Sequence, residues 1–172
     1  MSGRIRAVFG SVLFLALAPG TVAGLVPWWI SKWRFASASF LPVRALGILL
    51  ILAGIAELLD SFARFALEGI GTPAPVFPTR HLVVRGLYRH VRNPMYLAVA
   101  ALIFGQGLLF GNLELLAYAA AVCVGFHVFV VAYEEPTLGR NFGAEYRIYC
   151  ANVPRWRPRP RPWRATIGQG PV

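Results

Sequence analysis

Four long apolar runs, separated by short basic segments, constrain the fold of this chain more than any other feature. The last run is 21 residues long, or roughly 31 Å as a helix, which is enough to cross a bilayer. Hydrophobic residues make up 57% of the chain and charged residues 14%. We therefore predict an all-α, polytopic membrane helix bundle with about four transmembrane helices and a cytoplasmic C-terminal cap. The runs cover approximately residues 7–30, 46–67, 94–110 and 113–133.

The first apolar run has features of a signal peptide, because Arg4 and Arg6 precede it and it contains "TVAG", a candidate cleavage site. A signal peptide's apolar region is shorter, however, and this run continues to the aromatic pair Trp28-Trp29. A retained membrane span is therefore favoured over a cleaved one. We predict a single membrane domain over 1–172, in which 1–67 contribute two N-terminal spans.

The net charge of +10 comes from 17 Lys and Arg against 7 Asp and Glu. In a soluble protein this excess would favour nucleic acid, but here the basic residues lie between apolar runs and in the tail. Anionic membrane lipid is therefore the expected partner, and no nucleic acid is expected. The N-terminus, the connector 68–93 and the C-terminal tail carry most of the arginines, which places both termini in the cytoplasm. Cys123 and Cys150 form neither a disulfide framework nor a metal cluster, so no metal is expected.

Polar side chains form one stripe along the second run. At 100° per residue they fall within about 80° of one another. One interpretation is an Asp60–Arg64 pair that reaches the cytoplasmic surface. The other is the wall of a polar cavity, because ionisable groups in a membrane face protein or water rather than lipid. The stripe consists of Glu57, Asp60, Ser61, Arg64 and Glu68.

The segment "YRHVRNPMY", residues 88–96, places basic and aromatic residues in front of the third run. Asn93 is a suitable N-cap and Pro94 a suitable first helical residue, so a helix is predicted to begin there. Its free N–H groups and positive dipole end point into the basic connector and suit a carboxylate or phosphate. The alternative is that Arg89, His90 and Arg92 contact lipid headgroups.

Two acidic residues follow the fourth run, where we expect Pro136 to end the helix. Glu134 and Glu135 would then oppose the helix dipole, so they require a cationic partner. His127 lies seven residues before Glu134, on the same predicted face. The connector thus offers anion-binding groups and the helix end offers cation-binding groups. S-adenosylmethionine, with its carboxylate, ammonium and sulfonium, matches both.

The segments "LVVRGLYRHVRNPMY" and "YEEPTLGRNFGAEYRIYCANVPRW" resemble the isoprenylcysteine carboxyl methyltransferase and phospholipid methyltransferase family. These are integral-membrane enzymes that use S-adenosylmethionine without a Rossmann domain. The resemblance covers about residues 80–157, which would form the cofactor-binding core, and leaves 158–172 as a basic Pro/Arg tail. It assigns cofactor contacts to Arg80, His81, Leu82, Val83, Tyr88, Arg92, Asn93, Pro94, Met95, Tyr96, Gly105, Gly107, Glu134 and Glu135.

The chain departs from the family pattern at two positions. Asn93 replaces the histidine usual before the proline, which keeps hydrogen bonding but removes an imidazole. Val130 stands where the isoprenylcysteine enzymes hold the substrate carboxylate with an arginine, which disfavours a prenylcysteine acceptor. Gly105 and Gly107, in "GQG", match a motif suggested for phospholipid methyltransferases, but small residues at this spacing also permit close helix packing.

The resemblance implies direct transfer of the sulfonium methyl group to a lipophilic or amphipathic acceptor, with catalysis mainly by alignment in a water-poor pocket. Candidate catalytic residues are Glu57, Asp60 or His127 as a base for an amine, and Arg64 as the cation for a carboxylate. Two alternatives are an NADPH-dependent, sterol-reductase-like membrane enzyme and a small membrane partner protein without enzymatic activity.

The C-terminal "VPRWRPRPRPWR", residues 153–164, contains too many prolines for a helix, so an extended strip is predicted. We expect residues 153–155 to belong to a folded cap over the cofactor. The arginines beyond Arg155 are expected only to tether that cap to anionic lipid.

Overall fold

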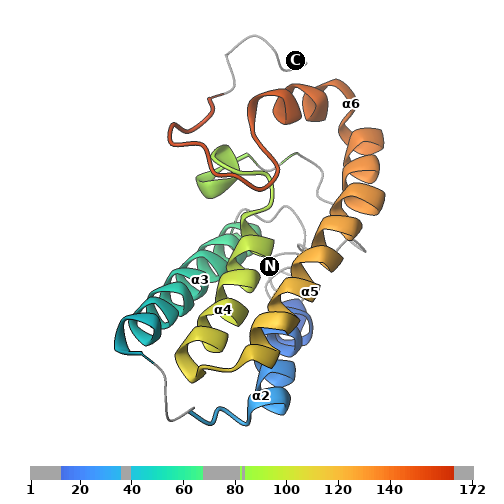
Figure 1. Ribbon diagram of the computed structural model, residues 1–172. Coiled ribbons are helices and arrows are strands. Elements are labelled where there is room, and N and C mark those ends of the chain that lie inside the picture. Colours follow the sequence, from blue (N-terminus) through green and yellow to red (C-terminus); the bar gives the residue numbers. More distant parts are fainter. Residues whose placement is uncertain (1–12, 36–39, 68–81, 83, 165–172) are drawn as a thin grey trace.

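The computed structural model describes residues 13–35, 40–67, 82 and 84–164, and of 64–67 it describes the backbone alone. Helices dominate these ranges, which contain no β-strand, so the prediction of an all-α membrane helix bundle is confirmed. Figure 1 shows α3, α4 and α5 side by side, with α2 beside α5 and the C-terminal segment at one end of the bundle. The elements are η1 (Thr21–Leu25), α2 (Val26–Ser31), α3 (Leu41–Leu67), η2 (Gly86–Arg89), α4 (Pro94–Phe110), α5 (Leu113–Phe129), η3 (Val130–Glu134) and α6 (Glu135–Asn152).

Three helical stretches are long and apolar enough to cross a membrane, namely Leu13–Ser31, Leu41–Ala63 and Leu113–Asn152. The fourth apolar helix, α4, has 17 residues and both of its predicted ends. At 1.5 Å per residue it extends about 25 Å, less than the hydrocarbon thickness of about 30 Å.

Glycines allow α3, α4 and α5 to approach one another closely. A Cβ added at Gly105 of α4 would lie 2.7 Å from the carbonyl oxygen of Gly47 in α3. A Cβ at Gly54 would lie 2.8 Å from the carbonyl oxygen of Ala98, and one at Gly107 would lie 2.5 Å from a methyl group of Leu116 in α5. The "GQG" motif is therefore a packing motif in this fold, in agreement with one of its two sequence interpretations.

The first span contains a π-helical turn, η1, followed by Pro27, and side chains from other helices satisfy the freed carbonyls. Pro27 has no N–H to donate to the carbonyl of Ala23, four residues earlier. Instead Gln106 Nε2 donates to Ala23 O at 2.7 Å, and Tyr118 Oη donates to Val22 O at 3.0 Å. Gln106, the middle residue of "GQG", thus satisfies a backbone carbonyl of the irregular helix where no water is available to do so.

The helix of the fourth run does not end at Pro136, so that prediction was wrong. A π turn, η3, closes with the N–H of Glu135 bonded to the carbonyl of Val130, five residues earlier. The wider turn accommodates the proline ring, which in a regular α-helix collides with the carbonyl four residues before it. The chain continues as α6 and bends at Gly143, whose φ of 50° and ψ of −116° are not helical.

Candidate functional site

The candidate site lies where α3, the connector, α4 and η3 meet, at the end of the bundle that the C-terminal segment covers (Figure 1). The connector enters it through η2, which begins at Gly86 with a φ of 54°, a conformation that glycine adopts without strain. η2 supplies Tyr88, and α4 supplies Tyr96 from its first turn. The π turn η3 supplies Glu134. Single-turn π bulges occur frequently at functional sites, because they redirect side chains.

Tyr96 and Glu134 form the central contact of the site. The Tyr96 hydroxyl donates to Glu134 Oε2 at 2.7 Å across 38 residues of sequence. The Tyr96 ring packs against Phe126, with 4.8 Å between ring centroids, and its edge meets Trp156 at 6.4 Å. Aromatic rings on two sides therefore fix the phenol that holds the carboxylate.

The Tyr88 phenol is influenced by carboxylates from two elements. Ser61 of α3 lies near the phenol, and both Glu134 and Glu57 act on it electrostatically. Burial raises the pKa of the Tyr88 phenol well above its usual value, and the two carboxylates add to this effect. Tyr88 is therefore a neutral phenol that donates or accepts hydrogen bonds at physiological pH.

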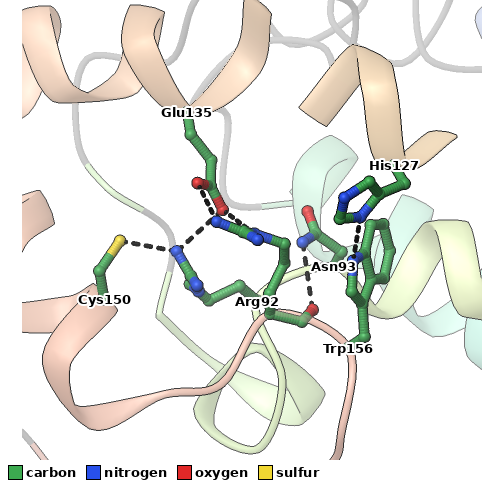
Figure 2. Close-up of polar contacts among 7 residues, drawn as sticks. Arg92, Asn93, His127, Glu135, Cys150 and Trp156 are labelled. Atoms are coloured by element: carbon green, nitrogen blue, oxygen red, sulfur yellow. Dashed lines mark hydrogen bonds and ion pairs between the residues drawn. The ribbon is translucent and has the colours of Figure 1, made fainter. Parts of the chain in front are cut away.

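Glu135 differs from its neighbour Glu134, because two guanidinium groups hold it. Arg155 Nε donates to Glu135 Oε1 at 2.7 Å and Arg155 Nη2 donates to Oε2 at 2.8 Å, a bidentate pair. Arg92 Nη1 donates to Glu135 Oε1 and to Cys150 Sγ, both at 2.9 Å (Figure 2). The hydrogen bonds to Glu135 raise the pKa of the Arg155 guanidinium. Glu135 thus joins the connector and the tail, while Glu134 points at Tyr96.

The C-terminal segment hydrogen-bonds to almost every residue of the connector from Tyr88 to Asn93. The backbone N–H of Arg92 donates to Pro154 O, that of Arg159 to His90 O, and that of Trp163 to Arg89 O, each at 2.9 Å. Side chains add Tyr149 Oη to Tyr88 O at 2.7 Å and Arg89 Nε to Trp163 O at 2.7 Å. We call residues 153–163 the strap.

The strap revises the predicted role of the tail. Residues 153–164 are non-helical, as the density of prolines predicted, but the segment bends at several residues and does not form the predicted extended strip. The expectation that residues beyond Arg155 only tether the cap was wrong, because Arg159 and Trp163 bond to the connector. Their partners are backbone groups, which a composition of alternating arginine and proline does not disclose.

Asn93 occupies the N-cap position of α4 but does not act as the predicted side-chain cap. Its φ of −124° and ψ of 56° turn the side chain away from the helix, and no side-chain capping bond forms. Its Nδ2 instead donates to the backbone carbonyl of Arg155 at 3.2 Å, as Figure 2 shows. The residue that departs from the family pattern therefore helps to hold the strap, and the first N–H groups of α4 keep their donor capacity.

The other predicted site residues fall into four groups. Gly105 and Gly107 lie two to three turns along α4 from Tyr96, in helix contacts. His127 is exposed and its Nδ1 accepts from Trp156 Nε1 at 3.0 Å, so its described partner is the strap rather than Glu134. Leu82 packs against Tyr146, Tyr149 and Val153, and Met95 packs against the transmembrane core. Arg80, His81, Val83 and the side chain of Arg64, with any Asp60–Arg64 pair, lie outside the described residues.

The sequence-based assignment missed four residues at or beside the site. They are Ser61, which lies near Tyr88, and Tyr149, Cys150 and Trp156. Ser61 was visible only as a member of the polar stripe. Within the described ranges, no three His, Cys, Asp or Glu side chains gather as metal ligands. The arrangement offers a carboxylate, two phenols and the free start of a helix in one place, which suits a ligand with both charges.

A family model described as phospholipid methyltransferase matches residues 43–145 of the chain. The match includes α3, the connector, α4, α5 and η3, and it ends before the strap. Comparisons with curated proteins and with solved structures return no match. The family match confirms the resemblance seen in the sequence and, with the apolar helices, identifies an integral-membrane methyltransferase. The chain belongs to the phospholipid methyltransferase family.

Proposed function

We propose that this membrane methyltransferase uses S-adenosylmethionine and transfers its methyl group to a lipophilic or amphipathic acceptor at the cytoplasmic membrane face. The observation that carries the proposal is which groups contact the Glu134 carboxylate. Its described partner is the neutral Tyr96 phenol, and no arginine, lysine or histidine of the described ranges forms an ion pair with it. A partly buried carboxylate without a protein cation is suited to a cationic ligand.

A second observation supports a ligand that also carries negative charge. The start of α4 has no side-chain cap, so its first N–H groups are available to an anion. Arg92 Nε is buried and has no hydrogen-bond partner in the part of the chain that the structure describes. A carboxylate bound there would satisfy both kinds of donor. S-adenosylmethionine carries such a carboxylate together with a sulfonium and an ammonium.

When bound, S-adenosylmethionine supplies an electrophilic methyl group on sulfur. The residues of this chain would align the methyl donor with the acceptor and exclude water. Such alignment can lower the barrier of a bimolecular step by several kcal/mol. The Tyr96–Glu134 pair and Tyr88 line the cofactor side. We further propose that Tyr96, in the first turn of α4, lies near the membrane surface, so that an acceptor with an apolar tail would reach the site from between the helices.

Glu134→Gln is expected to weaken binding of S-adenosylmethionine at least tenfold. The change removes a charged acceptor of about the same shape, and hydrogen bonds to charged groups contribute about 1.5–3 kcal/mol. Isothermal titration calorimetry of the purified protein in detergent measures the effect directly. Glu114→Gln is the matched control, because Glu114 is exposed in the first turn of α5, at the other end of that helix.

Equal binding by the two variants would contradict the assignment of Glu134. The same titration with NADPH addresses the alternative of a reductase, since a protein that binds NADPH and not S-adenosylmethionine is no methyltransferase of this kind. Absence of binding by either cofactor in the wild-type protein would favour the non-enzymatic alternative.

We also propose that both termini are cytoplasmic and that the strap meets anionic lipid. Arg157, Arg161 and Arg164 are exposed, and each basic residue near an anionic surface contributes about 1 kcal/mol of attraction. A reporter fused after Val172 and a Ser2→Cys label are therefore expected to be accessible from the cytoplasm only. Labelling of Ser2→Cys from the opposite side would reverse the assigned orientation of the first span.

A further inference from the structure

His127 is a polar residue on an otherwise apolar helical surface. Residues 115–133 include no Asp, Glu, Lys or Arg, and His127 is their only histidine. His127 is exposed, and so are Val124 and Val131, about one turn to either side of it. In a bilayer such a surface faces lipid, where an ionisable side chain without a partner is unfavourable. His127 therefore requires a hydrogen-bond partner at this position.

The strap supplies that partner. Trp156 Nε1 donates to His127 Nδ1 at 3.0 Å, as Figure 2 shows. An indole N–H can only donate, so His127 accepts through a neutral ring whose proton is on Nε2. The hydrogen bond thus occupies the basic nitrogen of His127. While it holds Trp156, His127 cannot act as the base that an amine acceptor would need.

The Trp156 indole covers one side of the central contact of the site. His127 precedes Glu134 by seven residues, so it lies roughly 10 Å farther along the helix from the end that the strap covers. The indole that reaches His127 meets the Tyr96 ring edge-on, with 6.4 Å between the ring centroids. Phe126 packs against the same ring at 4.8 Å. Trp156 therefore lies between Tyr96 and the exposed surface of α5 around His127.

The backbone on both sides of Trp156 is anchored, whereas the N–H of its indole forms a single hydrogen bond, to His127. Before Trp156, the Arg155 guanidinium holds Glu135 in a bidentate pair. After it, the backbone N–H of Arg159 donates to the carbonyl of the connector at 2.9 Å. Rotation about the side-chain torsions of Trp156 can therefore move the indole while the strap stays in place.

We propose that Trp156 controls the access of the acceptor to the site, and that its hydrogen bond to His127 holds this gate closed. Rotation of the indole away from His127 would expose the Tyr96–Glu134 pair to the bilayer, while Arg155 keeps the strap over the connector. The inference rests on the proposed function, in which an acceptor with an apolar tail arrives from the membrane. It adds a residue outside the family match, which ends at residue 145.

A carbodiimide that dissolves in the bilayer tests the gate. Dicyclohexylcarbodiimide adds to a carboxyl group and rearranges to a stable N-acylurea, so its reaction with Glu134 measures how often the site opens to the membrane. The full-length protein is reconstituted without cofactor in phosphatidylcholine vesicles, and mass spectrometry of its peptides follows the rate. The cationic, water-soluble ethyl-dimethylaminopropyl carbodiimide measures exposure of Glu134 to water in the same way.

Loss of the hydrogen bond is expected to open the gate. His127→Leu and Trp156→Phe should each raise the rate of Glu134 modification by the membrane-soluble reagent about two- to tenfold, the population change that one hydrogen bond controls. The double variant should react no faster than the single ones, because the bond is already absent. His127→Asn, whose amide oxygen can accept, should keep a rate close to that of the wild type. Trp29→Phe is the matched control, because Trp29 is exposed on α2, at the opposite end of the bundle (Figure 1).

The outcomes separate the gate from the proposed function. A wild-type protein that does not bind S-adenosylmethionine overturns the proposed function, whereas the modification rates still decide the gate. Equal rates for the wild type, His127→Leu and Trp156→Phe overturn the gate, and so do effects that simply add in the double variant. An equal rise with the water-soluble reagent would show that the whole strap has moved, which also overturns it. If thermal unfolding shows that Trp156→Phe fails to fold, His127→Leu, an apolar change on an exposed surface, decides the question alone.

Discussion

Truncation after Asn152 is expected to abolish binding of S-adenosylmethionine. The deletion removes Arg155 and with it the bidentate partner of Glu135, whose side chain is only 17% exposed. Glu135 keeps Arg92 as a partner, so the loss is that of a partly exposed charge-assisted interaction, about 1.5–3 kcal/mol. The deletion also removes the backbone partners of His90 and Arg92, so the segment that positions Tyr88 loses its support. Calorimetry of the truncated, full-length and control proteins measures the loss.

Truncation after Arg164 is the control and should leave binding unchanged, because the strap remains complete. A third protein, ending at Trp156, retains Arg155 but lacks Arg159 and Trp163. Its binding should be intermediate if those two residues support the connector as their hydrogen bonds indicate. Normal binding by this protein would show that the arginines beyond Trp156 contribute only to lipid attachment. Normal binding after Asn152 would remove the strap from the site altogether.

Gly105→Leu is expected to destabilise the folded protein by about 3 kcal/mol, at the upper end of overpacking effects. A Cβ at this position would lie 2.7 Å from Gly47 O and 3.0 Å from the backbone nitrogen of Ile51. Backbone atoms cannot rotate out of the way, so α3 and α4 must separate. Thermal unfolding in detergent, followed by tryptophan fluorescence, reports the change.

Gly125→Leu is the matched control for this substitution. Gly125 is an exposed helical glycine of α5, and a Cβ added there would meet no atom of a neighbouring element within 4 Å. Leucine should therefore be neutral or stabilising at this position through its helix propensity. Equal unfolding temperatures for the two variants would show that α3 and α4 tolerate separation. The packing role of Gly105 would then be wrong.

The helices of this protein could be predicted closely because their signals are local. Pro94 at a first helical position and Gly111 in the left-handed conformation at a C-cap define α4 without reference to the rest of the chain. Pro136 is a local signal of the same strength, yet it misled the prediction. The π turn that accommodates it depends on how α5 packs, which a residue pattern does not encode.

The site was less predictable than the fold, because its contacts connect distant residues. The resemblance selected Tyr96 and Glu134 separately, and the structure joins them. The same resemblance treated Glu134 and Glu135 alike, although arginines of the described ranges neutralise only Glu135. That difference depends on Arg155, which follows Glu135 by 20 residues and returns to it after the chain bends at Gly143 and leaves α6 at Asn152.

The position of the strap in the sequence has a consequence for how the protein is made. The membrane helices can insert and pack as they leave the ribosome, at about 5–20 residues per second. The connector, made earlier, lacks the hydrogen bonds that the carbonyls of His90 and Arg89 accept until Arg159 and Trp163 have been synthesised. An incomplete chain would therefore occupy the membrane without a finished cofactor site. The protein would therefore become able to catalyse its reaction in one late step of its synthesis, after its hydrophobic helices are already in the membrane.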